Sequence, residues 1–266
     1  MEQALESAQR ANKNGMNAIL NRLGEHMTSK SQIEETVSEY IKLISNLRKF
    51  KVSGGVSIKP TQVGLSKSYD DCRQNLKIII EKATISQSFV WIDMESTDFT
   101  GETIKTYLDL FEKYERLGLA IQANLRRSKQ DLEKILEYGA KIRLVKGAYR
   151  ESKKTAYKTR HEVDENYKRL MTMLFSNANE FAIATHDSKL IDLAITLSKK
   201  HEKKFEFQML KGIRDDLKPI LIRNGFSISE YIPYGTNWFP YSIRRLKERK
   251  RNILLLGSSF LHSHRV

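Results

Sequence analysis

The segment FVWIDMESTDFTGETIKTYLDLFEKYERLGLAIQA, residues 89–123, decides the fold class because it holds one complete strand, helix and strand in succession. The stretches FVWIDM (89–94) and GLAIQA (118–123) are short and largely apolar, which predicts buried strands. Between them, apolar residues recur every three or four positions, at Ile104, Tyr107, Leu108 and Phe111. That spacing predicts a helix with one buried face. Such a unit forms two parallel strands, because parallel neighbours need a long connection.

The same alternation continues along the chain. We expect eight strands, which are AILNRL (18–23), VSIK (56–59), FVWIDM (89–94), GLAIQA (118–123), KIRLVKG (141–147), FAIATH (181–186), FEFQML (205–210) and SISEYIPYG (227–235). Helical stripes separate them, and a further amphipathic helix is expected at 2–14. Eight strand and helix units joined by right-handed crossovers predict a (β/α)8 TIM-type barrel. The alternative is an open doubly wound sheet, although no GxGxxG motif follows an expected strand.

Sequence signals also mark three helix ends. Ser31 with Glu34 matches a capping box, in which two side chains bind backbone N–H groups of the first turn. Asp187 is expected to open one helix, and Gly225 is expected to close another.

The composition is that of an ordinary globular protein, with 40% apolar and 29% charged residues among 266. This is enough to build one substantial hydrophobic core. Because no linker or low-complexity stretch interrupts the chain, we expect a single domain over 1–266. Its N-terminal helix would lie within 1–15, and its tail at 252–266.

The chain is strongly basic, with 46 Lys and Arg against 32 Asp and Glu and a formal net charge of +14. Such a charge favours anionic partners. The excess is spread over the Lys-rich outer faces of the expected helices, which a basic solvated surface also explains. The run at 244–251 is open to interpretation as a nucleic-acid patch, but it lacks a recognised reading motif, so we expect no nucleic-acid partner.

The single cysteine, Cys72, excludes an internal disulfide and suits a reducing compartment. The sequence shows no signal peptide and no apolar run of the ~20 residues that span a bilayer. We therefore expect a cytoplasmic protein, either free or bound peripherally at the inner face of the membrane. The longest apolar run, ILLLGSSFL (253–261), is open to three interpretations: docking on a membrane, docking on a neighbouring subunit, or capping of the fold.

Polar residues gather where the expected strands end, and in such barrels chemistry is found at the C-terminal strand ends. These residues are Glu25, Lys59, Asp93, Glu95, Gln122, Arg143, Lys146, Tyr149, Thr185, His186, Gln208, Tyr231 and Tyr234. Strand ends are often polar because they meet solvent, but Arg143 and Lys146 lie within an otherwise apolar strand. An unpaired cation there is costly, which implies a buried anionic or electron-rich partner. Asp93 and Glu95 are internal candidates, and Arg143 and Lys146 are expected to face opposite sides of the strand.

Two other kinds of chemistry use residues of these types at strand ends. His186 has no second His or Cys at ligand spacing, so we expect no metal site. Lys146 is a strand-end lysine of the type from which barrel aldolases and transaldolases form a Schiff base. On the residues alone, this enzyme class stays open.

Seven motifs occur in barrel order along the chain. They are SIKPTQVGL (57–65), WIDME (91–95), IQANLRR (121–127), RLVKGAY (143–149), ATHD (184–187), FEFQMLKG (205–212) and YIPYGTNWFPYSIRRLKER (231–249). Together they resemble the proline dehydrogenase family of flavoenzymes, from about residue 4 to 250. The resemblance implies a distorted (β/α)8 barrel whose last helix lies over the barrel mouth, with FAD bound noncovalently at the C-terminal strand ends.

The reaction that the resemblance implies is oxidation of L-proline to Δ1-pyrroline-5-carboxylate, with hydride passing from substrate C5 to flavin N5. Electrons would then leave to a membrane quinone or another acceptor. The resemblance also implies a monofunctional enzyme, whose product goes to a pyrroline-5-carboxylate dehydrogenase on a separate chain.

For the substrate, the resemblance assigns Arg244 and Arg245 to the proline carboxylate, with Lys59 as a third positive charge. A guanidinium matches a carboxylate with two parallel hydrogen bonds. Asp93 would hold this cluster of cations, and Glu25 would pair with one of its arginines to gate the empty site. The residues expected to wall the pyrrolidine ring are Tyr149, Leu210, Tyr231 and Tyr241.

For the cofactor, the resemblance places Arg143 near flavin N5, where a fixed positive charge would stabilise the reduced, anionic ring. Gln122 would contact the pyrimidine end, and Thr185 and His186 would reach the phosphates and adenosine. The other expected cofactor contacts are Val145, Lys146, Gly147, Ala148, Arg245 and Glu248. The expected catalytic set is Arg143, Lys59, Asp93 and Tyr149.

Two positions depart from the family pattern. Pro60 stands where many relatives carry an aliphatic residue, which puts the backbone of Lys59 in question. Arg150 follows KGAY where some relatives carry an aromatic residue, which puts the cofactor contacts there in question.

Overall fold

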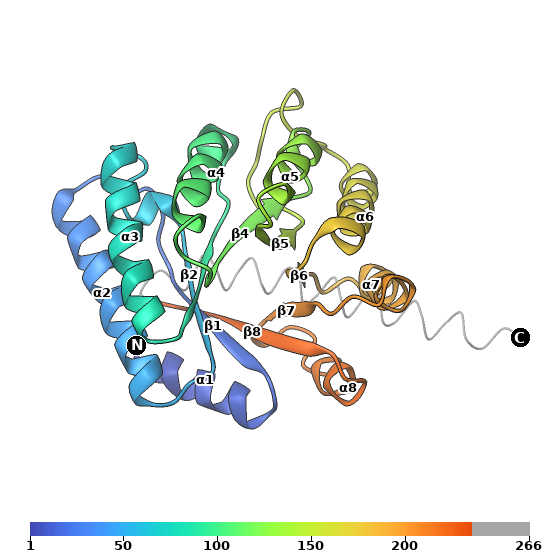
Figure 1. Ribbon diagram of the computed structural model, residues 1–266, viewed down its shortest axis with the longest axis horizontal. Helices are drawn as coiled ribbons and strands as arrows, with labels where there is room; N and C mark the ends of the chain where they lie inside the picture. Colours follow the sequence, from blue (N-terminus) through green and yellow to red (C-terminus); the bar gives the residue numbers. More distant parts are fainter. Residues whose placement is uncertain (236–266) are drawn as a thin grey trace, which may run out of the picture.

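Eight short strands close into a barrel in the computed structural model, which describes residues 1–235 (Figure 1). All neighbouring strands are parallel, and β1 pairs with β8 to complete the barrel. The strands are β1 (Asn17–Arg22), β2 (Gly54–Ile58), β3 (Phe89–Ile92), β4 (Leu117–Gln122), β5 (Lys141–Val145), β6 (Phe181–Ala184), β7 (Glu206–Leu210) and β8 (Ser227–Tyr234). Each begins and ends within two residues of its predicted bounds, and the predicted (β/α)8 TIM-type barrel is confirmed.

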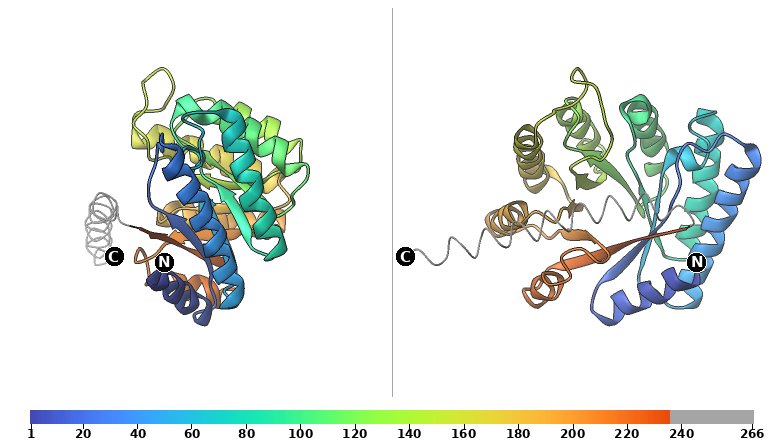
Figure 2. Two further views of the ribbon diagram at one scale, coloured as in Figure 1. Left: turned by 90° about the vertical axis from the view of Figure 1, so that its left-hand side faces the viewer. Right: turned by 180° about the vertical axis from the view of Figure 1, so that it is seen from behind.

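Helices connect successive strands and lie around the outside of the barrel (Figures 1 and 2). They are α2 (Lys30–Lys49), the 3-10 turn η1 (Pro60–Gln62), α3 (Tyr69–Ile85), α4 (Thr97–Phe111), α5 (Ser128–Leu136), α6 (Arg160–Asn177), α7 (Ser188–His201) and α8 (Lys218–Arg223). Before β1 comes α1 (Glu2–Lys13), whose contacts with β1 and β8 cover the seam where the barrel closes. Within residues 1–235, every helix is too short or too polar to cross a membrane.

The last helix, which was expected over the barrel mouth, and the tail at 252–266 lie outside the described residues.

Ser29 caps α2 in place of the expected Ser31. Ser29 has an extended backbone, and its Oγ accepts a hydrogen bond from the N–H of Gln32 at 3.2 Å. Ser31 already lies inside the helix, so the predicted capping box at this end was wrong. The other two helix ends are confirmed: Asp187 caps α7, and Gly225 follows α8 with a φ of +84°.

The main hydrophobic core lies between the strands and the surrounding helices. A second, small apolar cluster lies inside the barrel, because successive side chains of a strand point to opposite faces of the sheet. This inner cluster consists of Ile19, Trp91 and Ala182, with Phe89 and Tyr231 packed against it. Polar side chains of the candidate site lie directly against it, so the barrel interior is both packed and charged.

Candidate active site

Arg143, on β5, lies inside the barrel with 2% of its surface exposed. Its Nη2 donates to Oδ1 of Asp93 and, at 2.9 Å, to Oγ of Ser57. Its Nη1 donates to Oε1 of Gln208 at 3.3 Å. The three acceptors come from β2, from the end of β3 and from β7, so this one guanidinium connects strands across the barrel. Asp93 is one of the two expected internal counter-ions, and its ion pair with Arg143 offsets the cost of burying the cation. The other, Glu95, binds Thr61 instead.

Two aromatic rings flank the guanidinium of Arg143. Its central carbon lies 5.0 Å from the centroid of the Trp91 ring and 5.5 Å from that of Tyr231, a range in which cations are attracted to ring faces. The Tyr231 hydroxyl donates to Oδ2 of Asp93 at 2.9 Å, so one carboxylate holds both the cation and the phenol. Burial, and next the charge of Asp93, raise the pKa of Tyr231 well above its ordinary value. The phenol therefore keeps its proton.

The Nε of Arg143 is buried and has no hydrogen-bond partner among residues 1–235. Oδ1 of Asn124, just after β4, is buried and unpartnered in the same way. Buried polar atoms are nearly always paired, so each of these atoms, one on β5 and one just after β4, fits a bound polar group that completes its hydrogen bonds.

At Gly147 the main chain passes close to the side chain of Asn124. Its φ is +100°, and a Cβ at this position would lie 2.0 Å from Oδ1 of Asn124. A residue with a side chain would therefore be strained in its backbone and would displace Asn124. Val145 ends β5, and Gly147 and Ala148 follow it, so the main chain after β5 passes close to the unpartnered oxygen of Asn124. The expected cofactor contacts in this stretch thus fit a group that approaches the main chain closely.

Lys59, directly after β2, donates from Nζ to Oε1 of Glu25, in the loop after β1. The side chains of Lys59 and Glu25 are 18% and 30% exposed, so this ion pair is partly withdrawn from solvent. The expected partner of Glu25 was an arginine at 244 or 245, and both positions lie outside the described residues. Within residues 1–235, Glu25 pairs instead with the lysine of the same expected cluster.

Tyr149 lies beside a group of carboxylates. Burial, and then the charges of Glu95, Glu25 and Asp93, raise the pKa of Tyr149 far above its ordinary value. Its hydroxyl therefore stays protonated and is a donor at this end of the barrel. The expected catalytic residues Lys59, Asp93, Arg143 and Tyr149 are thus brought into one region.

Gln122 and His186 both bind main-chain atoms of neighbouring strand ends. Gln122, the last residue of β4, donates from Nε2 to the carbonyl of Glu95 at 2.6 Å. Nε2 of His186, after β6, accepts the N–H of Leu210 at 2.9 Å. This nitrogen therefore carries no proton, and the imidazole fixes the backbone of a residue that is expected to wall the substrate.

Lys146 points away from the barrel interior, as expected for the opposite face from Arg143. Its Nζ lies 2.5 Å from Oδ1 of Asp164, on α6, and 3.2 Å from Oδ2 of Asp187, the cap of α7. Arg160 also binds Oδ2 of Asp187, at 2.9 Å, and Oγ1 of Thr185 accepts the N–H of Asp187 at 3.2 Å. Two carboxylates thus hold the Lys146 amine outside the barrel interior, which argues against a Schiff base at this residue.

A family model described as proline dehydrogenase matches residues 4–255. This chain belongs to the proline dehydrogenase family. Curated relatives include proline dehydrogenase 2 of Bacillus subtilis (strain 168), 35% identical over 253 residues, and proline dehydrogenase of Deinococcus radiodurans, 35% identical over 270 residues. These alignments cover 94% and 98% of this chain, and 84% and 87% of the two relatives.

Solved structures of proline utilization A share the barrel. The match to the protein from Bdellovibrio bacteriovorus has a TM-score of 0.85 at 24% identity, and that from Corynebacterium freiburgense a TM-score of 0.80 at 22% identity. They cover 92% and 93% of this chain but 31% and 30% of the larger chains, so this chain spans about a third of their length. At such identities the likeness shows the shared fold.

Membership of the proline dehydrogenase family makes this chain an oxidoreductase and sets the aldolase alternative aside, in agreement with the ion pairs of Lys146. In the part of the chain that the structure describes, no three His, Cys, Asp or Glu side chains are grouped as metal ligands. The remaining expected site residues lie outside that part, and they are Tyr241, Arg244, Arg245 and Glu248.

Sequence reasoning missed two residues that bind the central arginine, Ser57 and Trp91. A signal for both was present. Alternate residues of a strand share a face, Trp91 lies two positions before Asp93, and Ser57 lies two positions before Lys59. In this proline dehydrogenase, the candidate site therefore includes residues inside the barrel as well as those at the strand ends.

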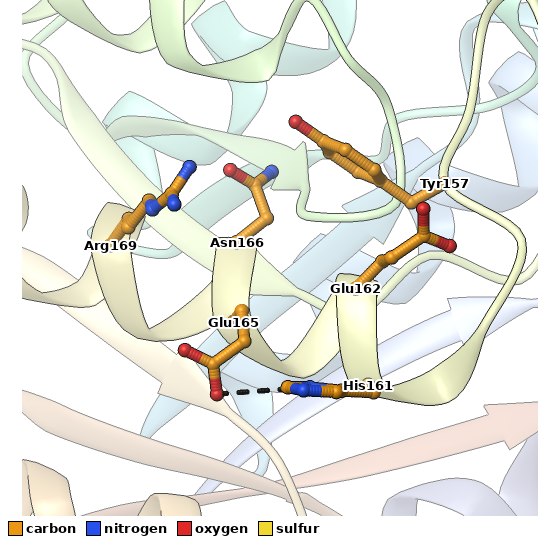
Figure 3. Close-up of a pocket in the computed structure, with 6 residues that line it drawn as sticks. All are labelled: Tyr157, His161, Glu162, Glu165, Asn166 and Arg169. Atoms are coloured by element: carbon orange, nitrogen blue, oxygen red, sulfur yellow. Dashed lines mark ion pairs between the residues drawn. The ribbon is translucent and has the colours of Figure 1, made fainter.

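A separate hollow of about 270 Å³ lies on α6 and the loop before it, and is lined by Tyr157, His161, Glu162, Glu165, Asn166 and Arg169 (Figure 3). Its polar side chains serve local structure. Glu162 completes the capping box of α6, Asn166 donates to the carbonyl of Ala123 at 2.8 Å, and His161 lies 4.0 Å from Glu165. Since no expected site residue lines this hollow, the barrel interior is the candidate active site.

Proposed function

We propose that this chain oxidises L-proline to Δ1-pyrroline-5-carboxylate with noncovalently bound FAD, and that the electrons pass on to a quinone or another acceptor. When bound, FAD would supply a two-electron acceptor for the hydride that leaves C5 of proline, with N5 as the accepting atom. The observation that carries this proposal is Arg143, buried and fixed inside the barrel, with an unpartnered Nε. Family membership supports the same activity.

Arg143 is suited to stabilise negative charge at a fixed place. Asp93, Ser57 and Gln208 hold its two terminal nitrogens, so the guanidinium does not need to reorient during the reaction. A charge that is already in place is most effective in a site from which water is excluded. The free Nε is then the donor that remains for the reduced ring.

Lys59 would receive the substrate carboxylate together with Arg244 and Arg245. In the structure, the Glu25 carboxylate already occupies Lys59. A substrate carboxylate would therefore replace one negative group by another at the same cation, and the charge balance of the site would be kept. The ring would lie against Tyr149, Leu210, Tyr231 and Tyr241.

The proposed cofactor contacts are Gln122, Arg143, Val145, Lys146, Gly147, Ala148, Thr185, His186, Arg245 and Glu248. Because the Lys146 ammonium is held by Asp164 and Asp187, Lys146 would contact the cofactor through its backbone. His186 would act in part by fixing the main chain of Leu210.

We also propose that residues 1–266 form one proline dehydrogenase domain, which works in the cytoplasm or at the inner face of the membrane. A separate pyrroline-5-carboxylate dehydrogenase would consume the product, and no nucleic-acid partner is proposed.

The visible spectrum of the purified protein tests this function. We expect a yellow protein whose flavin absorption is lost when L-proline is added without oxygen. A colourless protein that borohydride traps covalently on a carbonyl substrate would overturn the proposal in favour of an aldolase.

A further inference from the structure

The turn η1 (Pro60–Gln62) lies between Lys59 and the core and has no role in the reaction assigned above. We propose that Thr61 is a positioning residue that sets the place of both Lys59 and Glu25. It is fully buried between the Glu95 carboxylate and the loop that carries Glu25. The consequence for proline binding rests on the proposed function, in which Lys59 meets the substrate carboxylate.

Thr61 is anchored on its inner side by the carboxylate of Glu95, which is 0% exposed. The Thr61 N–H donates to Oε2 of Glu95 at 2.8 Å, and the Thr61 hydroxyl donates to Oε1 at 2.6 Å. Burial raises the pKa of Glu95, whereas the two bonds from Thr61 lower it. Hydrogen bonds to a buried carboxylate are strong, so these two bonds hold Thr61 in a fixed position.

The other side of Thr61 holds the loop after β1. Its Oγ1 accepts the N–H of His26 at 2.9 Å, and its carbonyl accepts the N–H of Met27 at 3.0 Å. His26 follows Glu25 directly in the chain, and Lys59 lies two residues before Thr61. Thr61 therefore fixes the main chain next to both partners of the Lys59–Glu25 ion pair.

Gln62, the next residue of η1, reinforces the same arrangement. Its Oε1 accepts the N–H of Lys59 at 3.3 Å, and its Nε2 donates to the carbonyls of Arg22 and Gly24 at 2.6 and 2.9 Å. Gln62 is fully buried, so its side of each of these bonds is shielded from water. The turn thus binds the backbone on both sides of the ion pair.

Glu95 also contacts Gln122, a residue of the proposed cofactor site. Its carbonyl accepts the Nε2 of Gln122, which is expected to contact the pyrimidine end of the flavin. Displacement of Thr61 would release the Glu95 side chain and leave this carbonyl contact in place. We therefore expect the loss of Thr61 to act on Lys59 and substrate affinity much more than on FAD content.

The reactivity of the Lys59 amine tests the positioning directly and without proline. The rate at which an amine-acylating reagent modifies Lys59 is measured by mass spectrometry against that of Lys30, which is 82% exposed and serves as an internal reference. In Thr61→Val, the hydroxyl that binds Glu95 is lost, and we expect Lys59 to react about tenfold faster. In Thr106→Val, a matched change at a fully buried threonine of α4, the Lys59 rate should not change.

Two further variants separate positioning from loss of folding. Thr61→Ser keeps the hydroxyl and should retain the slow Lys59 rate, and Glu95→Gln removes the charge that anchors Thr61 and should raise that rate. A Lys59 rate in Thr61→Val and Glu95→Gln equal to that of the wild type would overturn the proposal. So would a Thr61→Ser variant that reacts as fast as Thr61→Val.

Kinetics then connect the positioning to the reaction. We expect Thr61→Val to raise the KM for proline about tenfold while kcat and FAD content stay close to those of Thr106→Val. An unchanged KM would overturn the role in substrate binding. If the wild type itself fails to oxidise proline, the proposed function falls, and the Lys59 labelling still decides whether Thr61 positions the pair.

Discussion

Arg143 makes a set of contacts that a guanidinium can make and an ammonium cannot. Two terminal nitrogens bind three acceptors, the flat group lies near the rings of Trp91 and Tyr231, and Nε is left for a further partner. Lysine carries its donors on a single nitrogen and has no flat face. At the residue scale, the proposed chemistry therefore depends on arginine at this position.

Arg143→Lys should lower kcat/KM for proline at least ~100-fold, because the fixed charge near the flavin is displaced. Steady-state kinetics with flavin content and circular dichroism measured alongside check this. Arg127→Lys is the matched control, because Arg127 forms an exposed ion pair with Asp131 on α5, and it should leave activity unchanged. An Arg143→Lys enzyme that keeps its flavin and its full rate would remove Arg143 from the mechanism.

Sequence alone predicted Arg143 and offered Asp93 and Glu95 as internal counter-ions, because a cation in an apolar strand needs a partner. The structure selects Asp93. The sequence did not predict the partners of Lys146, since Asp164 and Asp187 come from the starts of two helices. Nor did it pair Glu25 with Lys59. Which carboxylate reaches which cation depends on loop geometry, and spacing along the chain carries no information about that.

At the scale of single elements, the Trp91 ring packs directly against the backbone of β4 at Gly118. A Cβ added to Gly118 would lie 2.4 Å from the Trp91 ring, so this strand accommodates the ring only with glycine there. Because the same ring flanks Arg143, packing at Gly118 is coupled to the candidate site.

Gly118→Ala should destabilise the protein by about 1–3 kcal/mol, the usual cost of overpacking a core, and should also reduce activity by displacing Trp91. Chemical denaturation measures the first effect. Gly101→Ala on α4 is the control, because a Cβ there meets nothing within 4 Å, and it should stabilise the helix by about 0.5–1 kcal/mol. Equal stability changes in the two variants would contradict the packing of Trp91 against Gly118.

Element boundaries were predicted well for strands and less well for caps. Three hydroxyl residues, Thr28, Ser29 and Ser31, lie around the start of α2, and only the backbone conformation shows that Ser29 is the cap. The Pro60 departure proves compatible with its neighbour, because Lys59 has φ −89° and ψ 126°, the extended conformation favoured before proline. Local sequence thus offers several candidate caps, and the backbone conformation at the start of each helix decides which one is used.

At the scale of the whole molecule, the barrel was predictable because eight apolar stretches alternate with helical stripes. The composition of its interior was not. Ser57, Trp91 and Gln208 come from β2, β3 and β7 and meet Arg143 of β5 inside the barrel, and their meeting is a property of the closed sheet. The cover of the closing seam by α1 is likewise visible only once the barrel is formed.

The proposed function depends on hydride transfer from C5 of proline to the flavin. Its most direct measurement is a single anaerobic turnover at saturating L-proline, in which the rate of loss of flavin absorption is compared for ordinary proline and for proline deuterated at C5. We predict a slower loss with the deuterated substrate, because the C5–H bond breaks in that step. Equal rates with the two substrates, or a flavin that stays oxidised with both, would contradict it.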